Sequence, residues 1–360
     1  MSSSPQPDNN RTLDEKEAAD LERSRQPKAV ALLSGGLDSN LAIRMMQEQG
    51  VDVEAVAIKT PFCDFDCGKG CGHRVKEVAD ELGVKLKTVY FGEEYLRMLK
   101  NPKHGYGSGM NPCIDCREMM YGAAKEHMEK TGADFIITGE VLFQRPMSQN
   151  NRALHIIENE AGLEGKVLRP LSAKHLPPTD AEKEGLIKRE NMGDIKGRSR
   201  KGQMALARKF GVQEPPNAAG GCLLTDPAFS KRVEDVMSHA ADIPSINDIE
   251  LLKVGRHFRL ADTAKLVVGR NKDENEVVRA LVVEETDVVL EARDHVGPTC
   301  ILRHNAAIDE ATVAKAASIV LRYSDAPKGA TSVVKVVSAG AEREITAEPA
   351  DSAWVDSIRI

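Results

Sequence analysis

The first two thirds of the chain alternate between two hydrophobic patterns. Short apolar runs bounded by turn residues are typical of buried strands, and the segments between them carry apolar side chains at helical spacing. Strands are predicted at residues 29–33, 51–60, 84–92, 133–142 and 166–174. Helices are predicted from about residue 41 to Gly50, over 74–83 and over 117–132. This alternation predicts an α/β fold, a parallel sheet with helices on both faces.

The pattern changes after about residue 245. Alternating strands separated by turn signals predict a smaller β-rich module of α+β type with one helix near residues 273–281, and residues 331–349 predict a closing hairpin. We therefore expect four parts. They are a disordered tail at 1–26, the α/β domain at 27–240, the module at 248–325 and a hairpin extension at 326–360.

Charge and cysteine content narrow the functional classes. The formal net charge of −6 excludes a global basic field, so any nucleic-acid surface must be local. No apolar run is long enough to span a bilayer and the N-terminus is polar, which predicts a cytoplasmic protein with no membrane partner. In that reducing compartment, the seven cysteines are expected to be thiols, catalysts or metal ligands rather than disulfides.

The first predicted strand runs into Ser-Gly-Gly-Leu-Asp-Ser at residues 34–39. Gly35 and Gly36 let the backbone approach a ligand closely, and the N–H groups that open the next helix favour an anion. The loop has neither the Gly-Lys-Ser/Thr ending of a Walker P-loop nor a dinucleotide Gly-x-Gly-x-x-Gly pattern. The alternative is an ordinary turn in which Asp38 or Ser39 caps the helix.

Further polar residues follow the other predicted strands. Lys59 and Thr60 end one strand and residues 138–140 end another, so both groups should meet the Ser-Gly-Gly loop at the carboxyl edge of the sheet. Gln144 and Arg145 come next and are candidates for a phosphate or for RNA, or are solvated polar groups. Basic side chains, which suit a phosphate backbone or a solvated face, gather in a glycine-rich loop at 103–110 and at Lys196, Arg198, Arg200, Lys201, Arg208 and Lys209.

Cys113 and Cys116 stand at the start of a predicted helix. That spacing lets both sulfurs approach one metal or cluster, although a redox pair, half a zinc site or simple packing remain alternatives. Cys222 follows two glycines in a segment with turn character, a setting for an accessible sulfur. Three cysteines can hold a cubane cluster with one open iron, whereas structural zinc needs a fourth ligand.

A second group of cysteines, Cys63, Cys67 and Cys71, recurs every four residues after the second predicted strand. With His73 it has the composition of a Cys₃His zinc site. The alternative is a set of loop thiols that bind nothing.

The Ser-Gly-Gly-Leu-Asp-Ser loop resembles the pyrophosphate loop of the ATP pyrophosphatase (PP-loop, HUP-like) superfamily, whose members adenylylate a carbonyl oxygen. The resemblance implies that the loop holds the phosphates of ATP with Mg²⁺, and it makes Asp38 a catalytic candidate as well. The candidate nucleotide-binding residues are Ser34, Gly35, Gly36, Asp38, Ser39, Lys59, Thr138 and Gly139.

The order of this loop, Asn-Pro-Cys-Ile-Asp-Cys and a distant single cysteine resembles the tRNA thiouridine synthases. The resemblance implies a [4Fe-4S] cluster on Cys113, Cys116 and Cys222 whose free iron binds hydrosulfide, or a persulfide pair formed by two of these cysteines. It further implies that a tRNA uridine or cytidine is adenylylated on its carbonyl oxygen and that sulfur then replaces AMP. The implied partners are tRNA and a sulfur donor, either sulfide or a persulfide carrier, and a homodimer is left open.

Residues 266–303 resemble the RNA-binding domain of the NFACT family, although Val-Val-Leu-Glu-Ala-Arg-Asp stands where an aromatic strand is usual. The resemblance implies that Gly269, Arg270, Asn271, Arg293, Asp294 and His295 line the RNA side. The alternative is a module that only packs on the catalytic domain.

Two other functions fit parts of the sequence. An ammonia-using PP-loop enzyme that forms an amide or a nitrile would need a structural zinc but no RNA module. A non-catalytic, nucleotide-dependent RNA-binding protein would need no cluster. Both leave the combination of Cys222 with an RNA-binding module unexplained.

Overall fold

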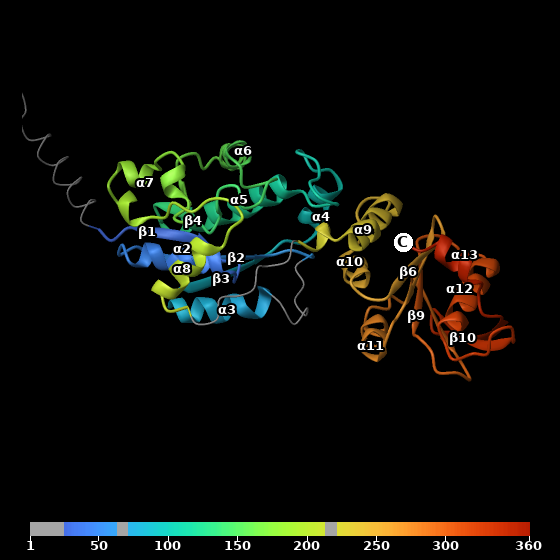
Figure 1. The fold of residues 1–360 in the computed structure, drawn as a ribbon. Coiled ribbons are helices and arrows are strands. Elements are labelled where there is room, and N and C mark those ends of the chain that lie inside the picture. The colour runs from blue at the N-terminus through green and yellow to red at the C-terminus, as the bar shows by residue number, and fades with distance from the viewer. Residues whose placement is uncertain (1–24, 63–70, 213–221) are drawn as a thin grey trace, which may run out of the picture. The chain divides into compact units, whose positions relative to one another are not determined.

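The computed structural model describes residues 25–62, 71–212 and 222–360, with backbone only at 71–73. Most of the expected disordered tail, together with Cys63 and Cys67, lies outside the described residues, and Cys71 is described only as the first residue of a helix. The chain forms two compact units (Figure 1). The N-terminal unit groups residues 1–59, 63–91 and 113–220, and the C-terminal unit groups residues 60–62, 92–112 and 221–360.

The N-terminal unit contains a five-stranded parallel sheet of order β3-β2-β1-β4-β5, which confirms the predicted α/β fold. Its strands are β1 (Lys28–Leu32), β2 (Asp52–Lys59), β3 (Lys85–Tyr90), β4 (Phe135–Thr138) and β5 (Val167–Leu168). The order reverses at β1, which pairs with β2 on one side and β4 on the other. Ligands of such sheets bind beyond the carboxyl ends of the strands at this reversal.

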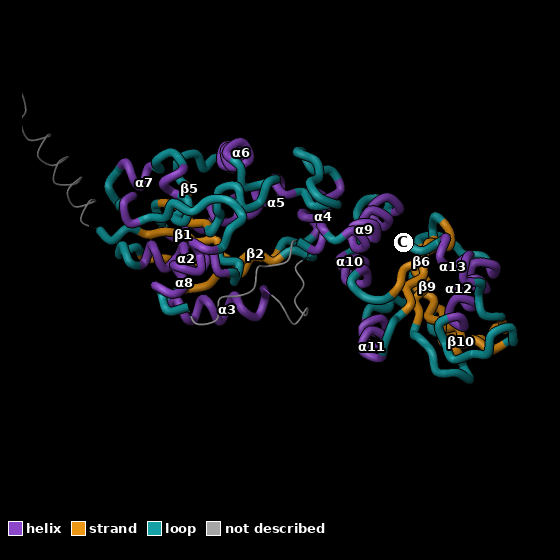
Figure 2. Tube along the Cα trace, viewed as in Figure 1, coloured by secondary structure: helices purple, strands orange, loops and turns teal. Residues whose placement is uncertain are grey.

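Helices cover both faces of this sheet, as Figure 2 shows. On one face, α2 (Leu37–Gln47), α3 (Cys71–Leu82) and α8 (Lys201–Lys209) contribute to one apolar core. On the other face, α5 (Cys113–Thr131) and α6 (Asn151–Ala161) contribute to a second. Because side chains alternate along a strand, Ala29 and Ala31 enter the first core and Val30 enters the second.

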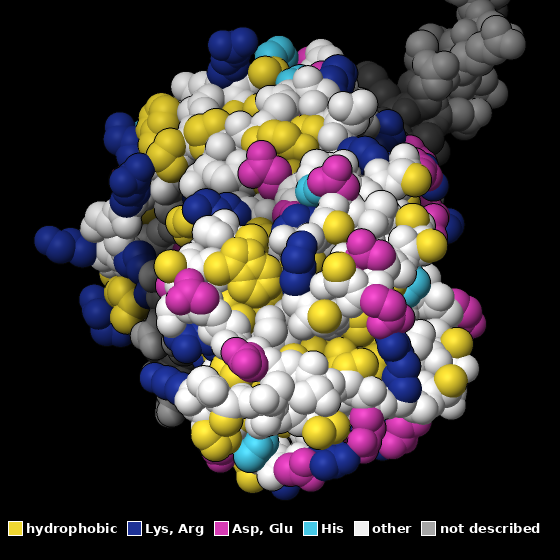
Figure 3. Space-filling model, turned by 90° about the vertical axis from the view of Figure 1, so that its right-hand side faces the viewer, with side chains coloured by type: hydrophobic (Ala, Val, Ile, Leu, Met, Phe, Trp, Pro, Cys, Tyr) yellow, Lys and Arg dark blue, Asp and Glu magenta, His cyan; other side chains and the backbone are white. Residues whose placement is uncertain are grey.

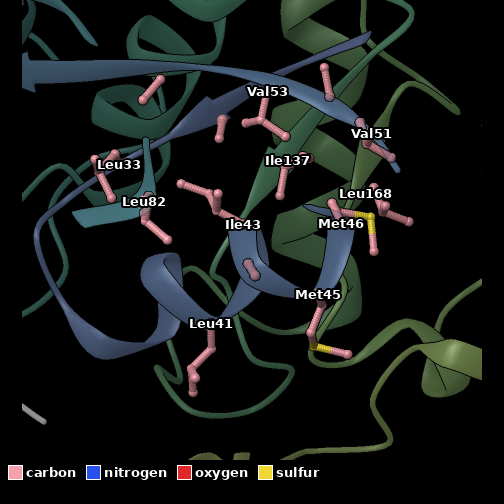
Figure 4. Packing of buried hydrophobic residues seen from close by; sticks show 14 of the residues in the cluster. Leu33, Leu41, Ile43, Met45, Met46, Val51, Val53, Leu82, Ile137 and Leu168 are labelled. Carbon is pink, nitrogen blue, oxygen red and sulfur yellow. The ribbon is translucent and has the colours of Figure 1, made fainter. Parts of the chain in front are cut away.

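The apolar spacing predicted for the first helix explains the larger core. Leu41, Ile43 and Met46 are fully buried, and they lie with Val53 and Ile137 of the sheet in Figure 4. Burial of each such side chain stabilises the fold by about 1.5–3 kcal/mol. This core holds α2, and hence the loop in front of it, in a fixed position.

The C-terminal unit contains a six-stranded antiparallel sheet of order β11-β10-β8-β9-β7-β6. Its strands are β6 (Arg256–Ala261), β7 (Ala264–Val268), β8 (Asp287–Ala292), β9 (Cys300–His304), β10 (Ser332–Ser338) and β11 (Ala341–Ala347). The hairpin expected as an extension is β10–β11, and β10 pairs with β8, so it belongs to the same sheet.

The single helix predicted for the module is present as α11 (Lys272–Ala280), but α12 (Glu310–Arg322) and α13 (Ser352–Ser357) are also present, so that expectation was incomplete. Asp309 caps α12, whose Ala316, Val320 and neighbours bury against the sheet. Alanine and other small residues fill much of α12, so its sequence carries only a weak helical pattern of large apolar side chains.

The rest of the C-terminal unit is helical. It comprises α4 (Glu93–Lys100), η3 (Leu223–Thr225), α9 (Pro227–His239) and α10 (Ile246–Leu252). The ring of Phe62 lies 5.9 Å from that of Tyr95 and 6.2 Å from that of Phe229, which ties residues 60–62 to α4 and α9. Within the described residues, no helix is both long and apolar enough to cross a membrane.

Candidate nucleotide site and cysteine pair

The Ser-Gly-Gly loop connects β1 to α2 at the reversal of strand order. Gly35 has a φ of 73°, a left-handed conformation that favours glycine, and Gly36 is the N-cap of α2. Ser39 Oγ donates to the Gly36 carbonyl (3.1 Å) and accepts from the Ser34 N–H (3.3 Å). No side chain caps α2 among the described residues, so its first N–H groups face outward, ready for an anion.

Gly139 lies directly against this loop. The register pairs Leu32 with Thr138, so β4 ends beside β1. A Cβ on Gly139 would lie 2.4 Å from the Ser39 nitrogen, closer than any real contact, so only glycine fits there. The predicted nucleotide-binding residues of β1, α2 and β4 therefore lie together, although their binding role remains a prediction.

Asp38 is the acidic group of the site. Its Oδ2 accepts a hydrogen bond from Gln144 Nε2 at 3.0 Å. Burial raises the pKa of Asp38, while Gln144 and the positive charges of Arg200 and Arg145 act in the opposite direction. The loop thus lies among cationic side chains, as a phosphate site requires.

Lys59 is the last residue of β2, and its Nζ lies 5.4 Å from the centre of the Tyr90 ring, within cation–π range. It ends a strand of the same sheet, as predicted. Thr60 is buried and groups with the C-terminal unit, where its Oγ1 accepts from the Phe62 N–H at 3.2 Å. A role for Thr60 at the carboxyl edge of the sheet remains a prediction.

Cys113 and Cys116 occupy the first turn of α5 and are half-buried cysteines outside any disulfide. Positions i and i+3 share one face of a helix, so the pair suits two ligand positions of a soft metal or cluster. Burial raises the pKa of Cys113, and the nearby charges of Arg117 and Arg145 oppose that rise.

Cys222 is half-buried at the N-cap of η3 in the C-terminal unit. Within the part of the chain that the structure describes, no group of three or more His, Cys, Asp or Glu residues is arranged to hold a metal ion. The three-cysteine set therefore remains a prediction, as does the set Cys63, Cys67 and Cys71.

A buried polar network lies at the end of β4. Glu140 Oε2 accepts hydrogen bonds from Tyr121 Oη (2.5 Å) and Arg169 Nε (3.0 Å), and Arg169 Nη2 donates to Tyr121 Oη (2.9 Å). Burial opposes ionisation of Glu140, but Arg117 and Arg169 lower its pKa. These contacts fix Glu140 directly after β4, and its expected place beside the nucleotide remains a prediction.

Sequence reasoning missed two residues of this region. Arg117 follows Cys116 and forms an ion pair with Glu140, and its position after the cysteine motif was the available signal. Gln203 of α8 is fully buried beside Asp38, whose pKa it lowers, although its amide makes no hydrogen bond of good geometry within the described residues. Nothing in the local pattern distinguishes Gln203 from a solvated helix residue.

The predicted basic cluster divides in two. A backbone bridge between Leu142 and Lys196, together with the Gly197 N–H donated to the Leu142 carbonyl (2.6 Å), places its first part beside the loop at 142–150. Lys209 instead pairs with Glu48 at 2.8 Å on the surface. The structure therefore places the segment that begins at Lys196, and not Lys209, near the candidate site.

In the C-terminal unit, the residues expected on the RNA side have protein partners. Asn271 caps α11, and the Arg270 guanidinium pairs with Glu274. Arg293 pairs with Asp294 (2.8 Å) and with Glu344 (2.7 Å). Figure 3 likewise shows basic and acidic side chains interspersed over one face of the molecule.

Two family comparisons match separate parts of the chain. Residues 24–175 match the family described as thiamine biosynthesis protein (ThiI), and residues 255–357 match the NFACT protein RNA binding domain. The first match begins and ends in the N-terminal unit but includes residues 60–62 and 92–112 of the C-terminal unit. The second match lies entirely in the C-terminal unit.

Individual relatives cover differing shares of the chain. The tRNA-specific 2-thiouridylase MnmA of Methylobacillus flagellatus is 26% identical over 266 residues, 69% of each protein. That of Acinetobacter baylyi is 31% identical over 140 residues, 35% of this chain and 36% of the relative.

The solved structures that match include two thiouridine-forming enzymes. A 4-thiouridine synthetase–RNA complex with bound ATP is 23% identical and matches with a TM-score of 0.33 over 52% of each chain. The U34-tRNA thiolase NcsA from Methanococcus maripaludis with its [4Fe-4S] cluster is 13% identical, with a TM-score of 0.33 over 68% of this chain and 78% of that one.

Proposed function

Since the protein joins a ThiI-family domain at residues 24–175 to an NFACT-type RNA-binding domain at 255–357, we propose that it is an ATP-dependent tRNA sulfurtransferase. The 2-thiouridylase relatives support tRNA as the substrate and sulfur transfer as the reaction. The proposal includes a cytoplasmic location.

The observation that carries the proposal is the Ser-Gly-Gly loop at the reversal of strand order. The uncapped N-terminus of α2, the close contact of Gly139 with Ser39 and the charge of Arg145 near Asp38 together suit a polyphosphate. An ordinary helix cap would not require the Gly139 contact.

The reaction has two steps. The carbonyl oxygen of a tRNA nucleobase, taken here as uridine, attacks the α-phosphorus of ATP, and the bond to the β,γ-phosphates breaks to release pyrophosphate. Hydrosulfide from the donor then adds to the activated ring carbon and loses its proton, and the carbon–oxygen bond breaks to release AMP and leave a carbon–sulfur double bond. In the first step, the loop N–H groups orient the phosphates, and Asp38 is the residue that would hold Mg²⁺.

Cys113, Cys116 and Cys222 are the residues that would carry the sulfur chemistry. The pair on α5 fits two ligand positions, and Cys222 would be the third ligand. A bound [4Fe-4S] cluster would supply an open iron for hydrosulfide from an external donor. The alternative is a persulfide on one of these cysteines, and iron, sulfide and zinc analysis of anaerobically purified protein distinguishes the two.

The test measures AMP and pyrophosphate formed from ATP in the presence of tRNA. Asp38→Ala and Ser39→Ala should each lower the rate by about a hundredfold or more, because both remove groups that position the phosphates. Asp180→Ala, at an exposed ion pair of the same unit, serves as the matched control. Undiminished AMP formation by both loop variants would contradict the proposal.

A further inference from the structure

The loop at residues 142–150, between β4 and α6, has its polar and apolar side chains reversed. Phe143 and Met147 are 47% and 51% exposed, whereas Ser148 and Gln149 are each only 3% exposed. Single exposed apolar side chains are common, but buried polar groups together with neighbouring exposed large apolar side chains are an informative departure. Exposed large apolar groups held in a fixed place indicate a binding surface.

The buried polar groups hold the loop in one shape. The Phe143 N–H donates to the Gln149 carbonyl (2.6 Å), the Gln149 N–H donates to the Arg145 carbonyl (2.9 Å) and the Arg145 N–H donates to Gln149 Oε1 (3.0 Å). Phe143 itself has a φ of 63°, a left-handed conformation rare for an aromatic residue. Strain of this kind is concentrated at functional sites.

The loop at residues 142–150 also lies beside the Ser-Gly-Gly loop. Gln144, the next residue after Phe143, donates to Asp38. On its other side, Leu142 pairs with Lys196, and both Lys196 and Arg198 are exposed. An aromatic surface flanked by cations is the arrangement that binds unstacked nucleic acid, because the ring stacks on a base and the cations meet its phosphates.

We propose that Phe143, with Met147, is the stacking surface for the unstacked nucleobase of the RNA substrate. This inference rests on the proposed function and adds the residue that positions the reacting base. Adenine of ATP is separated from the phosphates by its ribose, whereas the reacting base must bring its carbonyl oxygen to the α-phosphorus. Phe143 precedes Gln144, which contacts Asp38, so its ring lies where the RNA base, rather than adenine, would stack.

Steady-state kinetics with tRNA test the role. Phe143→Ala should lower kcat/KM for tRNA by about tenfold to a hundredfold and leave KM for ATP unchanged, because one base–aromatic stack is lost. Phe143→Tyr should restore the rate, since it keeps the ring. Ile246→Ala removes an exposed apolar side chain, 38% exposed, from α10 and should behave as the wild type. A wild-type kcat/KM for Phe143→Ala would overturn the proposal.

A binding measurement separates this inference from the proposed activity. The full-length Phe143→Trp variant adds one indole to the natural Trp354, so its emission is compared with that of the wild type. Unmodified tRNA should quench the added emission, and ATP alone should not. Quenching by ATP alone would assign the surface to adenine and overturn the proposal, as would no quenching by tRNA. Quenching by tRNA without any thiolated product would support the stacking surface and contradict the proposed function.

Discussion

Arg117 Nη1 lies 3.7 Å from Glu140 Oε1. Arg117 follows Cys116 in the first turns of α5, and Glu140 follows Gly139 at the end of β4. This ion pair therefore connects α5, which carries Cys113 and Cys116, to the end of β4, which lies against the Ser-Gly-Gly loop. Arg169, directly after β5, pairs with the same carboxylate and also with Glu158, which supplies the second negative charge.

Loss of the carboxylate in Glu140→Gln should lower the free energy of unfolding by about 3 kcal/mol, because the carboxylate faces both Arg117 and Arg169, and buried Arg169 would then keep only Glu158 as a counter-charge. Chemical denaturation measures the change. The control is Asp180→Asn, whose pair with Lys183 is exposed and should cost less than about 1 kcal/mol. Equal losses in the two variants would show that the buried network is no more important than a surface pair.

Gly139→Ala should weaken ATP binding by about tenfold or more, since its Cβ would meet backbone atoms of Ser39 and Asp38 and displace the loop. Isothermal titration with ATP and Mg²⁺ measures the affinity. Gly122→Ala is the matched control, because nothing lies within 4 Å of its Cβ on α5. That variant should keep its affinity and gain about 0.5–1 kcal/mol of stability. Normal ATP affinity in Gly139→Ala would remove this contact from the site.

Cys222→Ser should abolish formation of thiolated nucleoside while ATP-dependent adenylylation continues, because sulfur transfer needs the thiol and phosphate chemistry does not. Mass spectrometry of digested tRNA reports thiolation, a pyrophosphate assay reports adenylylation, and iron analysis reports on the cluster. Cys300→Ser is the control, since Cys300 is fully buried in β9. Full thiolation by Cys222→Ser would exclude Cys222 from the proposed set.

Asp235 makes the C-terminal unit sensitive to acid. Burial opposes ionisation of Asp235, but hydrogen bonds from Arg259 and the charges of Lys265 and Arg259 lower its pKa below the ordinary 3.8. His239 of the same helix also lies 3.7 Å from this carboxylate. Since the folded-state pKa is the lower one, the stabilisation is complete above pH 3.8 and is lost as the pH falls towards the folded-state pKa.

Comparison with Asp235→Asn isolates this contribution from that of other carboxylates. The difference in unfolding free energy between the wild type and the variant should be constant near neutral pH and shrink in acid. Denaturation at a series of pH values measures it. A difference that does not change between about pH 6 and pH 3 would contradict the lowered pKa.

The Ser-Gly-Gly loop between a strand and a helix and the alternation of strands and helices were predictable from the sequence because both depend on neighbours in the chain. An apolar run, two glycines and a helical pattern define β1, the loop and α2 within about twenty residues. The spacing of Cys113 and Cys116 likewise indicated a helix start. These features need no knowledge of strand order.

Which side chains contact the Ser-Gly-Gly loop depends on the tertiary structure, because the order β3-β2-β1-β4-β5 brings together segments far apart in the chain. Gln144 reaches Asp38 across 106 positions, and Phe62 joins the second unit through ring contacts with Tyr95 and Phe229. The exposed, left-handed Phe143 has no sequence signature either, since its conformation is imposed by hydrogen bonds to buried Gln149. Local patterns specify strands and helices, whereas contacts between their ends depend on how the sheet is assembled.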